Sequence, residues 1–344
     1  MSPYVVPPVV VRLGARLVSR RVHNPRLPWE VQRRRLDMLM GPWPLPRGTS
    51  VTKTALNGVP VEVVTAGRAR PRTGSGGARQ ATGAASGTTV VHFHGGGYCV
   101  GSPAEARDWA AHLSARAGCR VILPEYRLAP EHPYPAAVDD AHAVVNAALA
   151  GAAPGKAAPG ENAPGTVVVS GDSAGGGLAL GAALARAGTT DGAAQLAGCI
   201  LLSPWLDLTA DRAAVPELVR RDVVLSPAWL DACARAYAPV ADRAQPMVSP
   251  LHANLGGLPA LLIQCGTDDL LAPDAENLAV RAAADGVDVT YSRWTGLWHD
   301  FALQPDITAA AGRALAQAAQ FVSRVCGPAG PEQLADTAEG PDGG

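Results

Sequence analysis

The feature that most constrains the fold is the segment at residues 166–187, TVVVSGDSAGGGLALGAALARA. A run of valines ends in Gly-Asp-Ser-Ala-Gly-Gly-Gly, and an alanine-rich helical pattern follows directly. The valines predict a short buried strand, and the residues after the glycines predict a helix. A serine between the two projects from the end of the sheet at a helix N-terminus, where free N–H groups and the helix dipole favour negative charge.

The residues around this serine match a nucleophile elbow. Gly171-Asp172-Ser173-Ala174-Gly175 fits the pattern G-x-S-x-G, with a strand before it and a helix after it. So tight a turn strains the serine backbone, and glycine two residues to either side avoids clashes that a Cβ would cause. A glycine-rich turn with an N-cap serine, or a phosphate-binding loop, would be the alternative. The lysine of a Walker loop and the spacing of a dinucleotide fingerprint are both missing.

The rest of the chain alternates between short apolar segments and helical patterns. Strands are expected at residues 88–96, 119–127, 166–171, 197–207, 259–269 and 288–294, and helices at 103–117, 135–150, 175–187, 273–285 and 307–325. Residues 51–66 alternate like an edge hairpin with its turn at Asn57-Gly58. This order predicts an α/β protein whose mostly parallel central sheet is covered by helices on both faces.

The same pass along the chain suggests its organisation. Residues 1–50 are read as an N-terminal helical segment and 51–326 as the catalytic domain. Residues 208–250 break the alternation and form a helical insertion near the carboxyl ends of the strands, where ligand chemistry is expected. The segments 67–87 and 151–165 are expected to be surface loops and 327–344 a disordered tail, because they contain few large apolar residues.

Composition excludes several classes of partner. The formal net charge of the 344-residue chain is −1, which offers no electrostatic footprint for nucleic acid. The N-terminal apolar run is broken by prolines and too short to span a bilayer, so neither a secretory signal nor stable membrane insertion is expected. The six cysteines form no C-x-x-C pair and are expected to be reduced and structural, with no metal site, which favours a cytoplasmic protein.

A serine hydroxyl needs a base to take its proton. In this architecture the chain order is serine, acid, histidine. Two histidines follow Ser173, namely His252 and His299. His252 precedes every candidate acid and is read as a loop histidine, whereas His299 lies just past the strand expected at 288–294, so we predict His299 as the base.

The acid that orients this histidine is sought after the strand at 259–269. The segment LLIQCGTDDLLAPD offers Asp268 and Asp269 directly after the apolar run. We predict Asp268, which is closer to the strand end, and Asp269 stays as the alternative. Asp274 is read as a residue that caps or opens the following helix.

The reaction also needs donors for a tetrahedral oxyanion. His94-Gly95-Gly96-Gly97 follows the first apolar strand, in the place of an HGGG loop. We predict that the oxyanion hole is formed by the backbone N–H groups of Gly95, Gly96 and Ala174. His94 is expected to hold the loop through hydrogen bonds.

Together, the HGGG loop, GDSAG, an aspartate after a strand and the His-Asp-Phe loop resemble the hormone-sensitive-lipase-like esterases, the bacterial family IV of the α/β-hydrolase fold. PEYRLAPEHPYPAAVDDA (124–141) and SPLHANLGGLPALLIQCGTDDLL (249–271) are similar to that family as well. The resemblance covers about residues 85–325. It implies Ser173 as nucleophile, His299 as base, Asp268 as acid, and a cap built from the N-terminal helices and the 208–250 insertion.

The expected activity is hydrolysis of short-chain carboxylic esters, small molecules, through an acyl-enzyme and with no cofactor. Two departures from the family pattern stand out: the usual Asp-Pro-Leu is Asp268-Asp269-Leu270, and the usual His-Gly-Phe is His299-Asp300-Phe301. Hydrolysis of amides, formamides or lactones by the same triad is an alternative. A non-catalytic small-molecule receptor on the same fold is disfavoured because serine, acid and histidine are all present. The sequence does not decide between a monomer and a homodimer.

Overall fold

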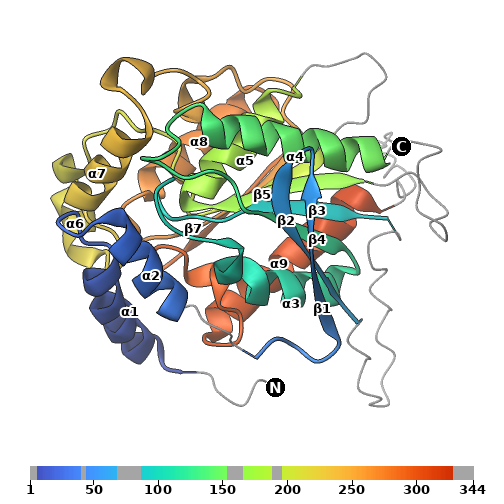
Figure 1. The fold of residues 1–344 in the computed structure, drawn as a ribbon, viewed down its shortest axis with the longest axis horizontal. Coiled ribbons are helices and arrows are strands. Elements are labelled where there is room, and N and C mark those ends of the chain that lie inside the picture. Colours follow the sequence, from blue (N-terminus) through green and yellow to red (C-terminus); the bar gives the residue numbers. More distant parts are fainter. Residues whose placement is uncertain (1–5, 40–43, 68–86, 153–165, 188–195, 328–344) are drawn as a thin grey trace, which may run out of the picture.

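The computed structural model describes residues 6–39, 44–67, 87–152, 166–187 and 196–327. Within these residues the centre is an eight-stranded sheet in the order β1-β2-β4-β3-β5-β6-β7-β8 (Figure 1). The strands are β1 (Thr49–Leu56), β2 (Val59–Ala66), β3 (Thr89–Phe93), β4 (Arg120–Pro124), β5 (Val167–Asp172), β6 (Leu196–Leu202), β7 (Ala260–Gly266) and β8 (Val289–Trp294). From β4 to β8 all neighbours are parallel, and the two antiparallel pairs are β1–β2 and β2–β4, so the sheet is mostly parallel as predicted.

The position of each strand in the sheet explains its residue pattern. All residues of β3 and β5 are buried, which is why these central strands are nearly continuous apolar runs. The edge strand β1 is largely exposed and alternates. Asn57 and Gly58 have φ values of 47° and 86° and form the expected two-residue hairpin turn.

Helices cover both faces of the sheet, and two apolar clusters fill the space between (Figure 1). On one face lie α3 (Arg107–Ala117) and α9 (Ala309–Cys326), and on the other α4 (Ala136–Ala152), α5 (Ser173–Leu184) and α8 (Ala272–Ala284). Short 3₁₀ turns are η1 (Pro103–Ala106), η2 (Arg212–Ala214), η3 (Val240–Asp242), η4 (Pro250–His252) and η5 (Phe301–Leu303). The α9 helix begins where the Thr308 hydroxyl accepts the N–H of Ala311.

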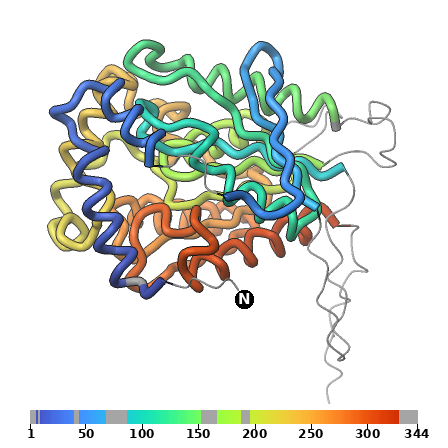
Figure 2. Tube along the Cα trace, turned by 60° about the horizontal axis from the view of Figure 1, so that its bottom comes forward, coloured from blue at the N-terminus to red at the C-terminus, as the bar shows by residue number. Residues whose placement is uncertain are grey.

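Four further helices lie beyond the carboxyl ends of the parallel strands. They are α1 (Pro8–Val22), α2 (Trp29–Leu39), α6 (Pro216–Arg221) and α7 (Pro227–Tyr237). Figures 1 and 2 both place α1 and α2 beside α6 and α7, although the two pairs are far apart in the sequence. A buried hydrogen bond of 2.9 Å from Trp229 Nε1 to Gln32 Oε1 joins α7 to α2.

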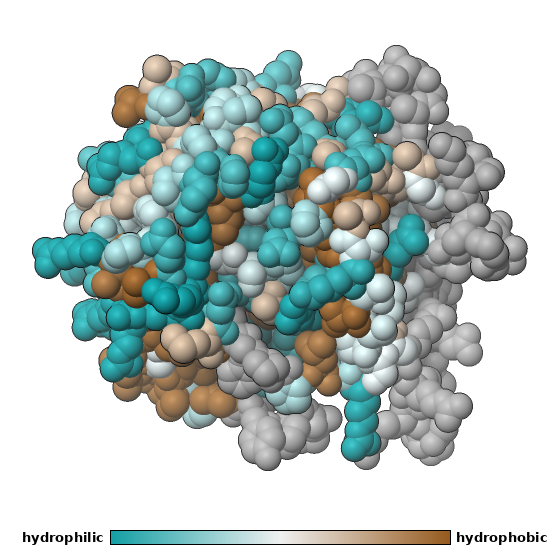
Figure 3. Space-filling model, in the orientation of Figure 1, coloured by the Kyte–Doolittle hydropathy of each residue, from teal (hydrophilic) through white to brown (hydrophobic). Residues whose placement is uncertain are grey.

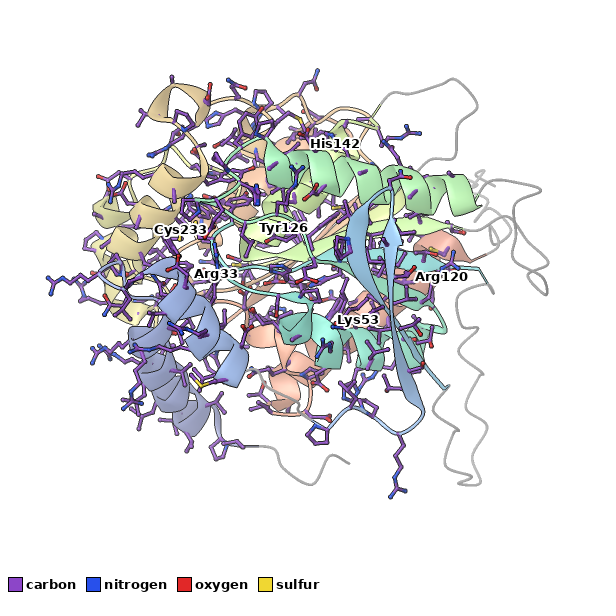
Figure 4. The ribbon with its side chains drawn as sticks, viewed as in Figure 1. Arg33, Lys53, Arg120, Tyr126, His142 and Cys233 are labelled. Atoms are coloured by element: carbon purple, nitrogen blue, oxygen red, sulfur yellow. The ribbon has the colours of Figure 1, made fainter. Side chains whose placement is uncertain are left out.

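Arg33 fixes α2 to the body of the protein. Its guanidinium donates to the carbonyl oxygens of Cys99 and Ala129, both at 2.8 Å, and pairs with Glu131. Because Cys99 follows the glycine loop at 95–97, this helix is tied to the segment that borders the ends of β3 and β5. Figure 4 labels Arg33 on α2 and Tyr126, whose hydroxyl contacts the carbonyl oxygens of His94 and Gly95 at the start of this loop.

The outer face of α1 is apolar. Val9, Val10, Leu13 and Leu17 are exposed there, and Figure 3 shows apolar side chains gathered at the lower left of the molecule, where α1 lies. No helix among the described residues has both the length and the apolar character needed to cross a bilayer. Most of the predicted loops at 67–87 and 151–165 and of the predicted tail at 327–344 lies outside the described residues. The second loop starts later than predicted, because residues 151 and 152 still belong to α4.

Candidate functional site

Ser173 begins α5 directly after β5, in the strained turn that the glycines predict. Its φ is +51°, a left-handed conformation that non-glycine residues rarely adopt. A Cβ on Gly175 would lie 2.0 Å from the carbonyl oxygen of Phe93, and one on Gly171 would lie 2.1 Å from that of Gly175. Only glycine fits at either position, so the elbow packs directly against the end of β3.

His299 lies in the loop between β8 and η5, and the carboxylate beside it is that of Asp269. The Nδ1 atom of His299 is 3.1 Å from both carboxylate oxygens of Asp269. The two side chains are 3% and 0% exposed, so this contact is shielded from water. The prediction that Asp268 orients His299 is wrong.

Asp268 points the other way, toward α1. Its Oδ2 atom is 2.7 Å from the Nη1 atom of Arg12, which also donates to the carbonyl oxygen of Gly296. The main chain leaves β7 at Gly266, and the N–H of Asp268 bonds the carbonyl oxygen of Leu297. Adjacent side chains in this stretch therefore project to opposite sides, and the second aspartate is the one that faces inward.

The Asp269 carboxylate is well supported. It accepts the N–H of Leu271 at 2.8 Å and a hydrogen bond from the hydroxyl of Ser203. Burial would raise the pKa of Asp269, but His299 and these donors outweigh it and keep the pKa below its usual value. Asp269 is therefore an anion that can hold the Nδ1–H of the imidazole.

Ser203 connects this pair to the elbow. It follows β6 with a φ of +45°, and its hydroxyl also accepts the N–H of Asp300 at 3.1 Å. Two residues on, the N–H of Trp205 donates to the carbonyl oxygen of Ser173 at 2.8 Å. Because β6 lies between β5 and β7, these bonds bring the histidine loop to the sheet edge where Ser173 begins its helix.

Asp300 contacts the other nitrogen of the imidazole. Its Oδ2 atom is 3.0 Å from Nε2 of His299, and its φ of +56° is again left-handed. Burial would lower the pKa of His299, but the carboxylates of Asp269 and Asp300 outweigh it and hold the pKa well above its usual value. Burial raises the pKa of Asp300 to about 7, against the opposing effect of His299.

The glycine loop after β3 faces the elbow. A Cβ on Gly95 would lie 2.3 Å from Oδ2 of Asp172 and 3.0 Å from Cβ of Ser173, so this backbone lies against the serine. Gly96 has a φ of +99°, and its carbonyl oxygen accepts the N–H groups of Cys99 and Val100. Among the described residues, the N–H groups of Gly95 and Gly96 have no acceptor.

His94 braces this loop, as the sequence suggests. Its Nδ1 atom is 2.8 Å from the carbonyl oxygen of Gly95, and its ring stacks on Tyr126 with 4.3 Å between ring centroids. The hydroxyl of Tyr126 donates to the carbonyl oxygen of His94. Burial lowers the pKa of His94 to about 4, so the ring is neutral and donates from Nδ1.

A second histidine–serine contact lies deeper in the sheet, and sequence reasoning missed it. His92 Nδ1 is 2.9 Å from Oγ of Ser170, and His92 Nε2 is 3.1 Å from Oδ1 of Asp172. His92 and Ser170 belong to β3 and β5 and are both 0% exposed. This network ties the elbow's aspartate to the neighbouring strand.

Other predicted residues have partners away from the serine. His252 is half-exposed and contacts Asp207 at 3.1 Å, in keeping with its reading as a loop histidine. Asp274 forms a buried ion pair with Arg212 at 2.7 Å, rather than only beginning α8. All six cysteines are buried free thiols, and no metal-binding group is found among the described residues.

Comparison with known proteins identifies the family. The family model for the α/β hydrolase fold matches residues 90–303. The chain is 36% identical over 243 residues to an acetyl-hydrolase of Streptomyces hygroscopicus, covering 70% of this chain and 77% of that protein. A crystal structure of an esterase from the bacterial hormone-sensitive lipase (HSL) family matches with a TM-score of 0.78 and 30% identity, over 94% of this chain and 99% of that one.

The chain belongs to the HSL family of α/β hydrolases. A further relative, an esterase of Acinetobacter venetianus, is 33% identical over 237 residues, which cover 68% of this chain and 74% of that protein. The predicted fold class and the family resemblance are both confirmed. Within this HSL-family fold, Ser173, Asp269 and His299 follow the carboxyl ends of the parallel strands β5, β7 and β8, the usual place for ligand chemistry in such sheets.

Proposed function

We propose that the protein is a serine hydrolase that cleaves short-chain carboxylic esters through an acyl-enzyme on Ser173, with His299 as base and Asp269 as acid. The observation that carries the proposal is the buried contact between Asp269 and His299, in a loop hydrogen-bonded to the end of β6 beside the elbow. An aspartate on Nδ1 fixes the tautomer in which Nε2 can accept the proton of a serine hydroxyl. Membership of the HSL family, with relatives named as esterases and acetyl-hydrolases, supports the ester as substrate.

The first half of the reaction is acylation. Ser173 Oγ attacks the ester carbonyl carbon while His299 Nε2 takes the hydroxyl proton, and the carbonyl oxygen becomes an oxyanion. We assign its stabilisation to the N–H groups of Gly95, Gly96 and Ala174. Unsatisfied donors in the glycine loop and the position of Ala174 at the N-terminus of α5 support this. When the intermediate collapses, the C–O bond breaks and His299 gives its proton to the leaving alcohol.

The second half is deacylation. His299 takes a proton from water, the hydroxide attacks the acyl carbon, and the proton returns to Ser173 Oγ as the acid is released. Asp269 stays ionised throughout and offsets the charge of the imidazolium. No step calls for a metal or organic cofactor.

We further propose that α1, α2 and the helices of the 208–250 segment act as a cap that shapes the acyl pocket. Their place beyond the carboxyl ends of the strands supports this assignment. The stacked rings of Tyr98 and Tyr237, 3.9 Å apart, and the buried Trp229 belong to the packed core. Trp205 is also buried, but it borders a pocket between α7 and the segment that follows β6. Because the cap bounds the site, we expect acetyl and butyryl esters to be preferred over long acyl chains.

The alternative triad Ser170–His92–Asp172 is disfavoured by burial. A nucleophile must reach a substrate, and His92 and Ser170 lie inside the sheet with no exposed surface. Neither lies at a helix N-terminus, where donors for an oxyanion are found. These residues are therefore assigned a structural role.

The test is hydrolysis of p-nitrophenyl acetate and butyrate by purified protein and two matched variants. We expect Ser173→Ala to lower kcat by about 10⁴- to 10⁶-fold, as in other triad deletions. Ser170→Ala, the same substitution three residues earlier, should keep kcat within about tenfold of the wild type. Equal activity of wild type and Ser173→Ala would refute the proposal. Faster turnover of matched amides or lactones than of esters would show that esters are not the preferred substrates.

A further inference from the structure

His299 has a carboxylate on each ring nitrogen, and only one of them has a place in the proposed mechanism. Asp269 holds Nδ1, whereas Asp300 Oδ2 lies 3.0 Å from Nε2, the atom that must accept the proton of Ser173. This ion-pair contact occupies the position at Nε2 that the serine hydroxyl needs. In this structure the base is thus engaged by its chain neighbour.

The surroundings favour a proton held between Nε2 and Asp300. The titratable groups that face this pair are the carboxyls of Asp172, Asp222, Asp269 and Glu105, the thiol of Cys265 and the ring of His23. Burial lowers the pKa of His23 to about 4, so it adds no positive charge. The nearby carboxylates make an extra proton on the pair favourable.

Asp300 is held loosely compared with Asp269. Its Oδ1 atom is buried and has no hydrogen-bond partner among the described residues, whereas Asp269 uses both oxygens. The Asp300 side chain is 21% exposed, and that of Asp269 is fully buried. When Asp300 turns away it gives up one ion-pair contact, and its partly exposed side chain can regain hydrogen bonds from water.

We propose that Asp300 is a latch on the base: it engages Nε2 of His299 in the resting protein and must turn away before Ser173 can be activated. The proposal rests on the triad assigned above. In the releasing step the Nε2–H bond breaks and the proton passes to a solvent water. Neutral imidazole is left facing the serine, and the Asp300 carboxylate, which no longer faces a cation, rotates toward solvent. One proton is released to solvent, and Asp300 acts as a positioning residue.

This arrangement predicts a specific pH dependence. While the proton stays on Nε2, His299 is positively charged and cannot take the proton of Ser173. Removing the Asp300 carboxylate withdraws a negative charge that stabilises imidazolium, so His299 should lose its proton at lower pH. The acid limb of the pH profile of kcat/KM reports ionisation of the free enzyme, so it should move to lower pH together with the pKa of His299.

The experiment compares pH profiles of kcat/KM for wild type, Asp300→Asn and Asp300→Gly, with Asp268→Asn as the charge-matched control. Asparagine and glycine both suit the φ of +56° at residue 300. We expect the acid limb of both Asp300 variants to lie about one pH unit lower, which raises kcat/KM at about pH 5 roughly tenfold relative to its plateau. The control should keep the wild-type limb, because Asp268 pairs with Arg12 and not with His299.

An unmoved acid limb, or a loss of kcat/KM that is equal at every pH, would overturn the latch and leave Asp300 with a purely structural role.

A second readout does not depend on turnover: ¹⁵N NMR titration of His299, assigned with His299→Asn. We expect the wild-type imidazole to titrate above the usual histidine range, and the midpoint to fall in Asp300→Asn. Equal midpoints in the two proteins would also overturn the latch. If Ser173→Ala keeps full activity the proposed hydrolase fails instead, and this titration still reports on the latch.

Discussion

Asp268 and Asp269 are neighbours in the chain, yet their side chains point to opposite sides of the same loop: the first pairs with Arg12 of α1 and the second with His299. One residue thus links the N-terminal helix to the loop after β7, and the next holds the proposed base. From this arrangement we expect the two acids not to be interchangeable.

The first prediction separates the two aspartates. Asp269→Asn should lower kcat by about 10⁴-fold on p-nitrophenyl acetate, because an amide cannot offset the imidazolium and permits the wrong tautomer. Asp268→Asn makes the same chemical change one residue earlier and should cost less than about tenfold, since it lacks contact with the imidazole. Steady-state kinetics on both purified variants checks this, and a larger loss for Asp268→Asn would reverse the assignment.

The second prediction concerns the anchor of α1. Arg12→Ala removes the ion pair to Asp268 and the hydrogen bond to Gly296. Because the pair is only partly buried, with side chains 29% and 14% exposed, we expect a loss of about 1 kcal/mol or less in global stability. The N-terminal segment should nevertheless be cleaved faster in limited proteolysis, with KM more affected than kcat. Unchanged cleavage would show that other contacts hold the helix.

The third prediction concerns the buried ion pair of Arg212 and Asp274. Both side chains are less than one tenth exposed, and Asp274 also accepts the N–H groups of Leu206 and Asp207. Arg212→Ala leaves a buried carboxylate without its cation and should cost about 3–5 kcal/mol of unfolding free energy.

The matched control is Arg220→Ala, which removes an exposed pair with Glu217 and should cost about 0.5 kcal/mol or less. Urea unfolding followed by circular dichroism measures both. Equal midpoints for the two variants would mean that the buried pair contributes no more than the exposed one.

The fourth prediction follows from the low pKa of His94. Since its folded pKa of about 4 lies below the usual value, its contribution to stability is complete above about pH 6.5 and is lost as the pH falls toward 4. The full loss is on the order of 3 kcal/mol. Between neutral and acid pH, the free energy of unfolding should therefore fall less for His94→Gln than for the wild type. His252→Gln, at a half-exposed loop site, is the control and should follow the wild type.

The sequence was sufficient to predict the fold and the general location of the site. Strands that are buried on both faces appear as apolar runs, and the G-x-S-x-G and HGGG patterns reflect close approaches that only glycine permits. Gly171, Gly175 and Gly95 each lie where a Cβ would overlap another atom. These steric requirements restrict each position to glycine, so they can be recognised from the sequence.

Which of two adjacent acids faces inward could not be predicted in the same way. It depends on where β7 ends and on Arg12, more than 250 residues earlier in the chain, which draws Asp268 outward. The one available signal was that the residue after the pair is the buried Leu270. The contact of Asp300 with Nε2 likewise depends on a left-handed backbone at residue 300, where glycine is the usual family residue.

The most direct measurement of the central claim is the site of covalent labelling by a fluorophosphonate, determined by peptide mapping of the intact protein. We predict a single adduct on Ser173 that is absent from Ser173→Ala and forms about 10³-fold or more slowly in Asp269→Asn, because the triad must activate the hydroxyl. An adduct on Ser170 or Ser203, or no adduct at all, would contradict the account.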